Sequence, residues 1–135
     1  MALQFSTTVR NAILDVIEST ISTSAVLKIR TGSAPADCGT ADSGTVLATL
    51  TLPSDWMAAA SSGSKAKSGT WQDASADNSG TAAHFRLYAS DGTTVHAQGT
   101  VTATGGGGDM TVDSTSFTAG QSFTINTFTL TAGNA

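Results

Sequence analysis

His84, His96 and Cys38 are the side chains of this sequence that could act as nucleophiles, proton carriers or soft metal ligands near neutral pH. Cys38 lies in a polar, turn-rich stretch without a nearby histidine, and no Gly-x-Ser-x-Gly nucleophile motif is present. The two histidines are expected on one face of a β-hairpin, but roughly 13 Å apart by the strand rise. That separation is too large for a shared metal ion. The sequence therefore predicts neither a catalytic residue nor a metal site.

Two further segments resemble ligand-binding loops in composition alone. Asp73, Asp77 and Asn78 lack the alternating acidic spacing and the distal glutamate of a calcium loop, so an Asx turn is expected there. The run Gly105–Gly108 is followed by Asp109 and a predicted strand, whereas a phosphate loop needs a lysine and a helix N-terminus. No cofactor is expected at either segment.

Aromatic and polar side chains suggest two kinds of binding surface. Trp56, Trp71 and Tyr88 could form a platform that stacks on sugars, but aromatic residues make up only 6% of the chain and are needed for a core. The polar face of a predicted hairpin is the better contact surface, because Tyr and Arg concentrate binding energy. The alternative is an ordinary solvated face. This predicted contact face comprises His84, Arg86, Tyr88, His96 and Gln98.

The hairpin itself extends over Thr81–Thr102. Apolar and polar residues alternate on both sides of Asp91-Gly92, which is a strong short-range hairpin signal. A three-residue loop keeps the apolar and polar faces separate, whereas a two-residue loop would mix them. The expected register pairs Ser90 with Thr94, Leu87 with Ala97 and Tyr88 with His96.

Short strands with Gly- and Ser-rich turns dominate the rest of the sequence. A long polar loop is expected at Ser33–Gly44, and a β-bulge at Asn126–Thr127, where the apolar phase of the last strand shifts by one residue. The segment 54–60 fits a helical turn capped by Ser54 or a continuing strand. Besides the hairpin, strands are predicted at 25–31, 45–52, 65–72, 110–113 and 122–131.

One helix is predicted at Ser6–Ile21, with Ser6 as its N-cap. Its apolar residues span roughly 200° of the circumference, whereas a helix packed on one core needs about 100°. We therefore expect contacts on two sides, the second side being covered by a loop of the same chain or by another subunit. The apolar residues are Val9, Ala12, Ile13, Val16, Ile17 and Ile21, with Leu14 off the main stripe.

These elements predict an all-β protein, a β-sandwich or jelly-roll-like domain with one N-terminal amphipathic helix. The expected organisation is a single domain over 1–135, with a helical arm at 1–23 and the sandwich at 24–135. The residues expected at protein interfaces are Val9, Ile13, Leu14, Ile17, Ile21, Arg86, Tyr88 and His96.

Charge and hydropathy exclude several classes of partner. The net charge is −4 and the six Lys and Arg form no basic stripe, which argues against nucleic acid. No apolar run approaches the roughly 18 residues that span a bilayer, and no secretion signal or disulfide pair is present. Charged residues are only 12% of the chain, about half the usual share. We expect a soluble protein that is made in the cytoplasm and packs against other proteins.

Three stretches, Leu27–Pro53, Ser79–Val101 and Gly107–Ala132, resemble the capsid cement or decoration proteins of tailed bacteriophages. The similarity is greatest to those of short-tailed phages, a Bordetella phage among them. The resemblance implies a non-enzymatic virion protein on the capsid exterior that binds the major capsid protein and itself, as a dimer or trimer. The loops at 33–44 and 105–108 would then touch the shell or solvent. The alternatives are a tail or fibre module that binds host-surface glycans, and an enzyme that the motifs do not reveal.

Overall fold

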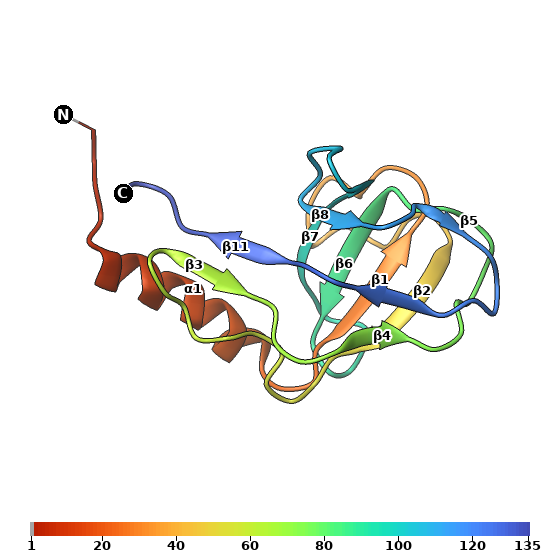
Figure 1. Ribbon diagram of the computed structural model, residues 1–135, viewed down its shortest axis with the longest axis horizontal. Coiled ribbons are helices and arrows are strands. Elements are labelled where there is room, and N and C mark those ends of the chain that lie inside the picture. The colour runs from red at the N-terminus through yellow and green to blue at the C-terminus, as the bar shows by residue number, and fades with distance from the viewer. Residues whose placement is uncertain (1) are drawn as a thin grey trace.

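The computed structural model describes residues 2–135, which form a mostly β protein with one N-terminal helix, as predicted (Figure 1). In chain order the elements are α1 (Thr7–Ile21), β1 (Val26–Arg30), β2 (Val46–Thr51), β3 (Ser64–Ala66), β4 (Trp71–Asp73), β5 (Gly80–Thr81), β6 (His84–Tyr88), β7 (Val95–Ala103), β8 (Met110–Val112), β9 (Ser116–Phe117), β10 (Phe123–Ile125) and β11 (Thr129–Thr131).

The helix begins and ends through local hydrogen bonds. Ser6 is the N-cap, as predicted, and its Oγ accepts a hydrogen bond of 3.2 Å from the Val9 N–H. At the other end the Ser22 N–H donates to the Glu18 carbonyl at 2.8 Å, and Ser22 turns the chain with a φ of 76°. Among residues 2–135, no helix has the length and hydropathy needed to cross a membrane.

A curled five-stranded sheet in the order β2-β1-β6-β7-β8 carries the core. All its pairs are antiparallel except β7 and β8, which are parallel. Leu27 pairs with Leu50 on one side and with Leu87 on the other, so apolar residues meet on one face. The opposite face, here called the back face, carries Arg30 and Arg86.

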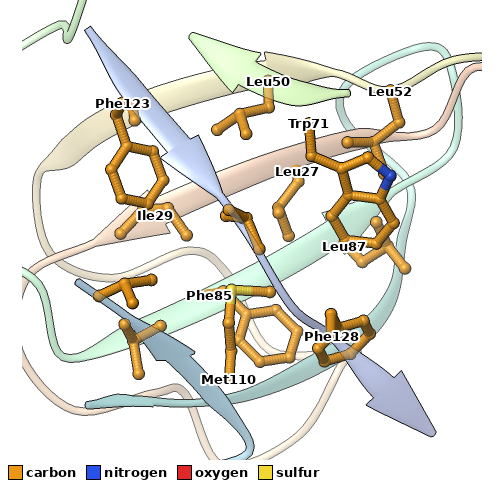
Figure 2. Close-up of a cluster of buried hydrophobic side chains, with 14 of the residues drawn as sticks. Leu27, Ile29, Leu50, Leu52, Trp71, Phe85, Leu87, Met110, Phe123 and Phe128 are labelled. Carbon is orange, nitrogen blue, oxygen red and sulfur yellow. The ribbon is translucent and has the colours of Figure 1, made fainter. Parts of the chain in front are cut away.

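Three two-stranded pairs accompany this sheet, namely β4 with β10, β3 with β11, and β5 with β9. Figure 2 shows Trp71, Phe123 and Phe128 beside the apolar side chains of the large sheet. The ring of Phe128 lies 5.7 Å from that of Trp71 and 5.8 Å from that of Phe85, between centroids. The core therefore joins residues that are far apart in the sequence.

The hairpin between β6 and β7 is confirmed, but its loop is one residue longer than predicted. Leu87 pairs with Ala97 as expected, whereas Tyr88 pairs with Val95 because the register shifts at this point. The Ala89 N–H donates to the Thr94 carbonyl at 2.9 Å, in place of the expected Ser90–Thr94 pair. The Asp91 carboxylate explains the longer loop, since it accepts hydrogen bonds from the N–H groups of Thr93 and Thr94 and from the Thr94 hydroxyl.

Two predicted strands are each divided into two. The segment 122–131 forms β10 and β11, which pair with β4 and β3, so the phase shift at Asn126–Thr127 marks a change of partner and the predicted bulge is wrong. The segment 65–72 is divided between β3 and β4 in the same way. The segment 54–60 is neither a helical turn nor a named strand. It runs antiparallel to the chain at β3, with an isolated bridge between Met57 and Lys67.

The molecule is elongated, with α1, β3 and β11 at one end and the five-stranded sheet at the other (Figure 1). Both chain ends lie at the α1 end. The strands β3 and β11, both from the predicted sandwich segment 24–135, therefore lie at the same end of the molecule as α1. The glycine run folds back onto β7, where Gly106 and Gly108 donate to the Ala103 carbonyl and to Thr102 Oγ1.

Candidate interaction surfaces

The predicted contact face on the hairpin is the back face of the sheet, and the 33–44 loop covers it. Arg86 is 1% exposed, and Tyr88 and His84 are equally buried. Gln98 is half-buried, and only His96, which projects at the register shift, is exposed. The prediction that this face meets solvent or a partner is therefore wrong for His84, Arg86 and Tyr88, because the chain's own polar loop occupies it.

The Asp42 carboxylate makes the central contact between the 33–44 loop and the back face. Its Oδ1 accepts hydrogen bonds from Arg86 Nη1 at 2.6 Å and from the Tyr88 hydroxyl at 2.8 Å. Its Oδ2 accepts from Arg30 Nη2 at 2.9 Å. One carboxylate, itself 37% exposed, is therefore the shared counter-charge of two buried guanidinium groups and also accepts a hydrogen bond from a buried phenol.

Backbone carbonyls of the loop and its neighbours add further hydrogen bonds to the back face, although Arg30 Nε and His84 Nε2 are buried without a partner among the described residues. Arg86 Nη2 donates to the Asp37 carbonyl at 2.9 Å, and its Nε donates to Gln98 Oε1 at 3.0 Å. The Gln98 amide donates to the Pro35 carbonyl at 2.7 Å. The His84 Nδ1 lies 2.6 Å from the Gly32 carbonyl and must donate to it. These contacts fix the 33–44 loop to the sheet along its length.

The electrostatics of this network favour the charged form of Asp42. Burial would raise the pKa of the Asp42 carboxyl, but the hydrogen bonds from Arg86 and Tyr88 and the charge of Arg30 outweigh it and lower the pKa below its ordinary value. The pKa of Tyr88 is raised, first by burial and then by its hydrogen bond to Asp42. At neutral pH the Asp42 carboxyl is therefore ionised and the Tyr88 hydroxyl keeps its proton.

The other side chains considered for chemistry lie apart. Cys38 is half-buried in the 33–44 loop. Asp73 accepts a hydrogen bond from the Ser75 N–H at 3.0 Å, as in the Asx turn that was predicted. Within the described chain, no group of three or more His, Cys, Asp or Glu side chains is arranged to hold a metal ion.

The three aromatic residues considered as a sugar platform are in the interior. Trp56, Trp71 and Tyr88 are each fully buried. The indole N–H of Trp56 donates to the Ser22 carbonyl at 2.9 Å, and that of Trp71 to the Ser68 carbonyl at 3.1 Å. They are structural residues and present no stacking surface.

The helix α1 has two apolar faces with different surroundings. Leu14 and Ile21 are buried, at 2% and 4% exposed, and Ile17 packs against the core. On the other side Val9, Ile13 and Val16 are 43%, 46% and 59% exposed. Of the two covers expected for this second side, a loop of the same chain is absent among residues 2–135. We call these three side chains the exposed helix face.

A buried lysine anchors α1, and the sequence reasoning missed it. Lys65 of β3 is 3% exposed, and its Nζ lies 2.8 Å from Asp15 Oδ1 and 2.9 Å from Glu18 Oε2. Burial would lower the pKa of Lys65, but the hydrogen bonds to both carboxylates raise it. Asp15 and Glu18 are three residues apart on α1, which is the one signal in the sequence for a shared cation.

An apolar groove of about 500 Å³ lies next to α1 and β11. Its lining includes Ile17 of α1, Thr129–Thr131 of β11, and Leu87, Ala97 and Phe128 of the core. The exposed helix face continues from this groove, because Ile13 is one turn before Ile17. Apolar surface is therefore concentrated at the α1 end.

Comparison with protein-family models, with curated proteins and with solved structures finds no match to this chain.

Proposed function

We propose that this protein is a structural component of a tailed-phage virion, a cement or decoration protein that binds the outside of the assembled head by protein–protein contacts. Its partners are the major capsid protein and further copies of itself. The observation that carries the proposal is the exposed helix face, three branched apolar side chains that the chain itself leaves uncovered. A contiguous apolar patch on a small protein marks an interaction surface.

The rigidity of the β-sheet part of the protein supports the same role. We infer that the five-stranded sheet and the smaller strand pairs form the two layers of a sandwich related to a jelly roll. The Asp42 network stiffens one face, and the aromatic core stiffens the interior. A cement protein must keep its shape while many copies each contribute a modest interface, typically about 800 Å² per partner.

The loops supply a second contact region. The 33–44 loop is fixed to the sheet by its inner side, while Ala36, Gly39 and Ala41 are exposed on its outer side. A loop held in one conformation loses little entropy on binding. We assign this outer side and the glycine run at 105–108 to contact with the shell or solvent.

The glycan-binding alternative has less support. It needs exposed aromatic rings for stacking, and both tryptophans and the single tyrosine are buried. We therefore propose no glycan site.

Binding to heads tests the proposal directly. Heads assembled from the major capsid protein encoded nearest to this chain would be incubated with the purified protein and sedimented. We expect saturable binding, and a higher temperature at which the heads disassemble. A protein that stays in the supernatant at all concentrations and leaves head stability unchanged would overturn the proposal.

A matched pair of variants locates the contact. Ala41→Arg places a large charge on the outer side of the 33–44 loop, and Asn134→Arg places the same charge near the C-terminus, away from that loop. We expect the first variant to bind heads less tightly and the second to bind as the wild type does. Equal binding by both would exclude the loop as the contact.

A further inference from the structure

The strand β11 has one free edge. Its hydrogen bonds to β3 are bracketed by the Lys67 N–H to the Phe128 carbonyl at 2.9 Å and by the Ala132 N–H to the Gly63 carbonyl at 3.0 Å. Bonds in an antiparallel pair alternate, so Leu130 directs its N–H and C=O toward β3. Thr129 and Thr131 direct theirs away from β3, where no described strand pairs with them.

The other strand of this pair is protected. The Ala66 carbonyl of β3 accepts from the Ala58 N–H at 2.8 Å, and Ser64 exchanges two hydrogen bonds with Ser61. The segment 57–61 thus covers the outer edge of β3. Figure 1 shows β11 extending from the body with β3 on one side only. At the α1 end, within residues 2–135, the open strand edge is that of β11.

Nothing in the sequence of β11 protects this edge. Natural edge strands are blocked by lysine, proline or a bulge, and the sequence Thr129-Leu130-Thr131 contains none of these. Its side chains are uncharged, so a second copy of the same strand meets no like-charge repulsion. The hydrogen-bonding pattern is also symmetric about Leu130.

We propose that β11 pairs antiparallel with β11 of a second copy across a two-fold axis at Leu130. Thr129 of each copy then lies opposite Thr131 of the other, and each such pair exchanges two backbone hydrogen bonds. The four strands β3, β11 and their symmetry mates form one continuous sheet. This inference rests on the self-association in the proposed function, and it specifies a dimer and its contact.

The same arrangement covers the exposed helix face. Lys65 and Leu130 are paired neighbours whose side chains share one face of the β3–β11 pair, and Lys65 binds α1 on that face. In the dimer both helices lie on this one face of the continuous sheet. The charged residues Arg10, Asp15 and Glu18 of α1 are already engaged by the Ala132 carbonyl and by Lys65, so the approaching side of the helix is apolar.

Proline scanning of the edge tests the hydrogen bonds. Thr131→Pro removes an N–H that points away from β3, so it blocks pairing with a second copy and leaves the β3–β11 pair intact. Thr131→Val changes the same side chain and keeps the N–H. We expect monomers of Thr131→Pro and dimers of Thr131→Val and wild type by light scattering. A dimeric, folded Thr131→Pro would overturn the proposal.

A cysteine placed at the axis tests the register. In a Cys38→Ser background, Leu130→Cys faces its own copy at a non-hydrogen-bonded position, where Cα atoms are about 4.5 Å apart. Thr129→Cys faces Thr131 instead, and its own copy lies beyond about 7 Å, too far for a disulfide. We expect rapid oxidative dimerisation of the first variant and at least tenfold slower dimerisation of the second. Equal rates would exclude this register.

Head binding separates this inference from the proposed function. If Thr131→Pro is a folded monomer that still sediments with heads at lower apparent affinity, strand pairing is supported and cementing is independent of it. If wild type is monomeric at concentrations that saturate heads, the strand pairing is wrong while the cement role stands.

Discussion

The back face of the sheet buries polar side chains, whereas the α1 end of the molecule exposes apolar ones. On the back face two arginines and a tyrosine are buried beneath the 33–44 loop, with Asp42 as their common partner. At the α1 end three apolar side chains and a strand edge are left open. The back face, which the sequence predicted to be a contact surface, is internal. The second apolar side of α1, which was expected to be covered, is exposed.

This contrast shows that polarity alone does not locate an interface. A charged group is tolerated inside when a preorganised partner and backbone carbonyls replace water. An apolar group stays outside when the chain has no further segment to cover it. The surface available to partners is therefore what remains after the chain has satisfied its own groups.

The largest effect should come from removing the shared carboxylate. Asp42→Ala leaves Arg30 and Arg86 buried without a counter-charge, and we expect the free energy of unfolding to fall by roughly 3 kcal/mol. Urea denaturation followed by tryptophan fluorescence measures this. Asp55→Asn, an exposed acid with no ion pair among the described residues, is the control and should change little. A small loss in Asp42→Ala would mean that the loop does not seal the face.

Two neighbouring positions on α1 should differ sharply in their effect on unfolding. Leu14→Ala removes a buried side chain and should lower the free energy of unfolding by about 2–4 kcal/mol. Ile13→Ala removes an exposed one and should lower it by less than about 0.5 kcal/mol. Denaturation at low protein concentration, where association does not contribute, is the measurement. Similar losses would show that Ile13 is covered within the monomer.

Acid should weaken the back face. Because Asp42 has a lower pKa in the folded protein than in the unfolded chain, the unfolded chain binds its proton first as the pH falls. The stabilisation is complete above the ordinary carboxyl pKa of about 4 and is lost as the pH falls below it. We expect the urea midpoint to decrease from pH 5 to pH 3, and to decrease less in Asp42→Asn. An equal decrease in both would assign the effect to other carboxylates, since the pKa values of Asp15, Asp37, Asp91 and Asp109 are also lowered.

A substitution on the exposed helix face should have the smallest effect on folding while weakening association. Val16→Ser replaces the most exposed residue of the exposed helix face, so the free energy of unfolding of the monomer should change by less than about 0.5 kcal/mol. The dimer dissociation constant should rise, because apolar area at the contact is lost. Analytical ultracentrifugation over a concentration series measures it. Thr20→Ala, an exposed change one turn further along, is the control.

Local patterns predicted much of the fold. The Ser6 cap, the helix after it, strands β1 and β2 and the pairing of Leu87 with Ala97 follow from periodicity and turn chemistry, which act over a few residues. The longer hairpin loop could also have been predicted, because Asp91 lies two and three residues before Thr93 and Thr94, a spacing that favours an Asx turn. The width of the apolar arc on α1 indicated a second apolar face beyond the core contact, and Val9, Ile13 and Val16 form it; the contact expected on that face stays a prediction.

Other features could not be read from local patterns. The change of strand partner at Asn126–Thr127 has the same phase signature as a bulge, and only the positions of β3 and β4 distinguish the two. The burial of Arg86 and Tyr88 depends on a loop about fifty residues earlier in the chain. Alternation on a strand marks two faces, but it does not say what covers the polar one.

The amino-acid sequence by itself determined a β-rich chain with a capped N-terminal helix, because turn residues and apolar spacing act on neighbouring residues. The tertiary structure alone decided which charges are internal and which apolar groups remain open. Those outcomes depend on Asp42 contacting Arg30, Arg86 and Tyr88 at once. They also depend on the outer edge of β3 being covered by the segment 57–61, while no segment within residues 2–135 covers the outer edge of β11. Such long-range encounters are set by the path of the whole chain, which no short window of sequence contains.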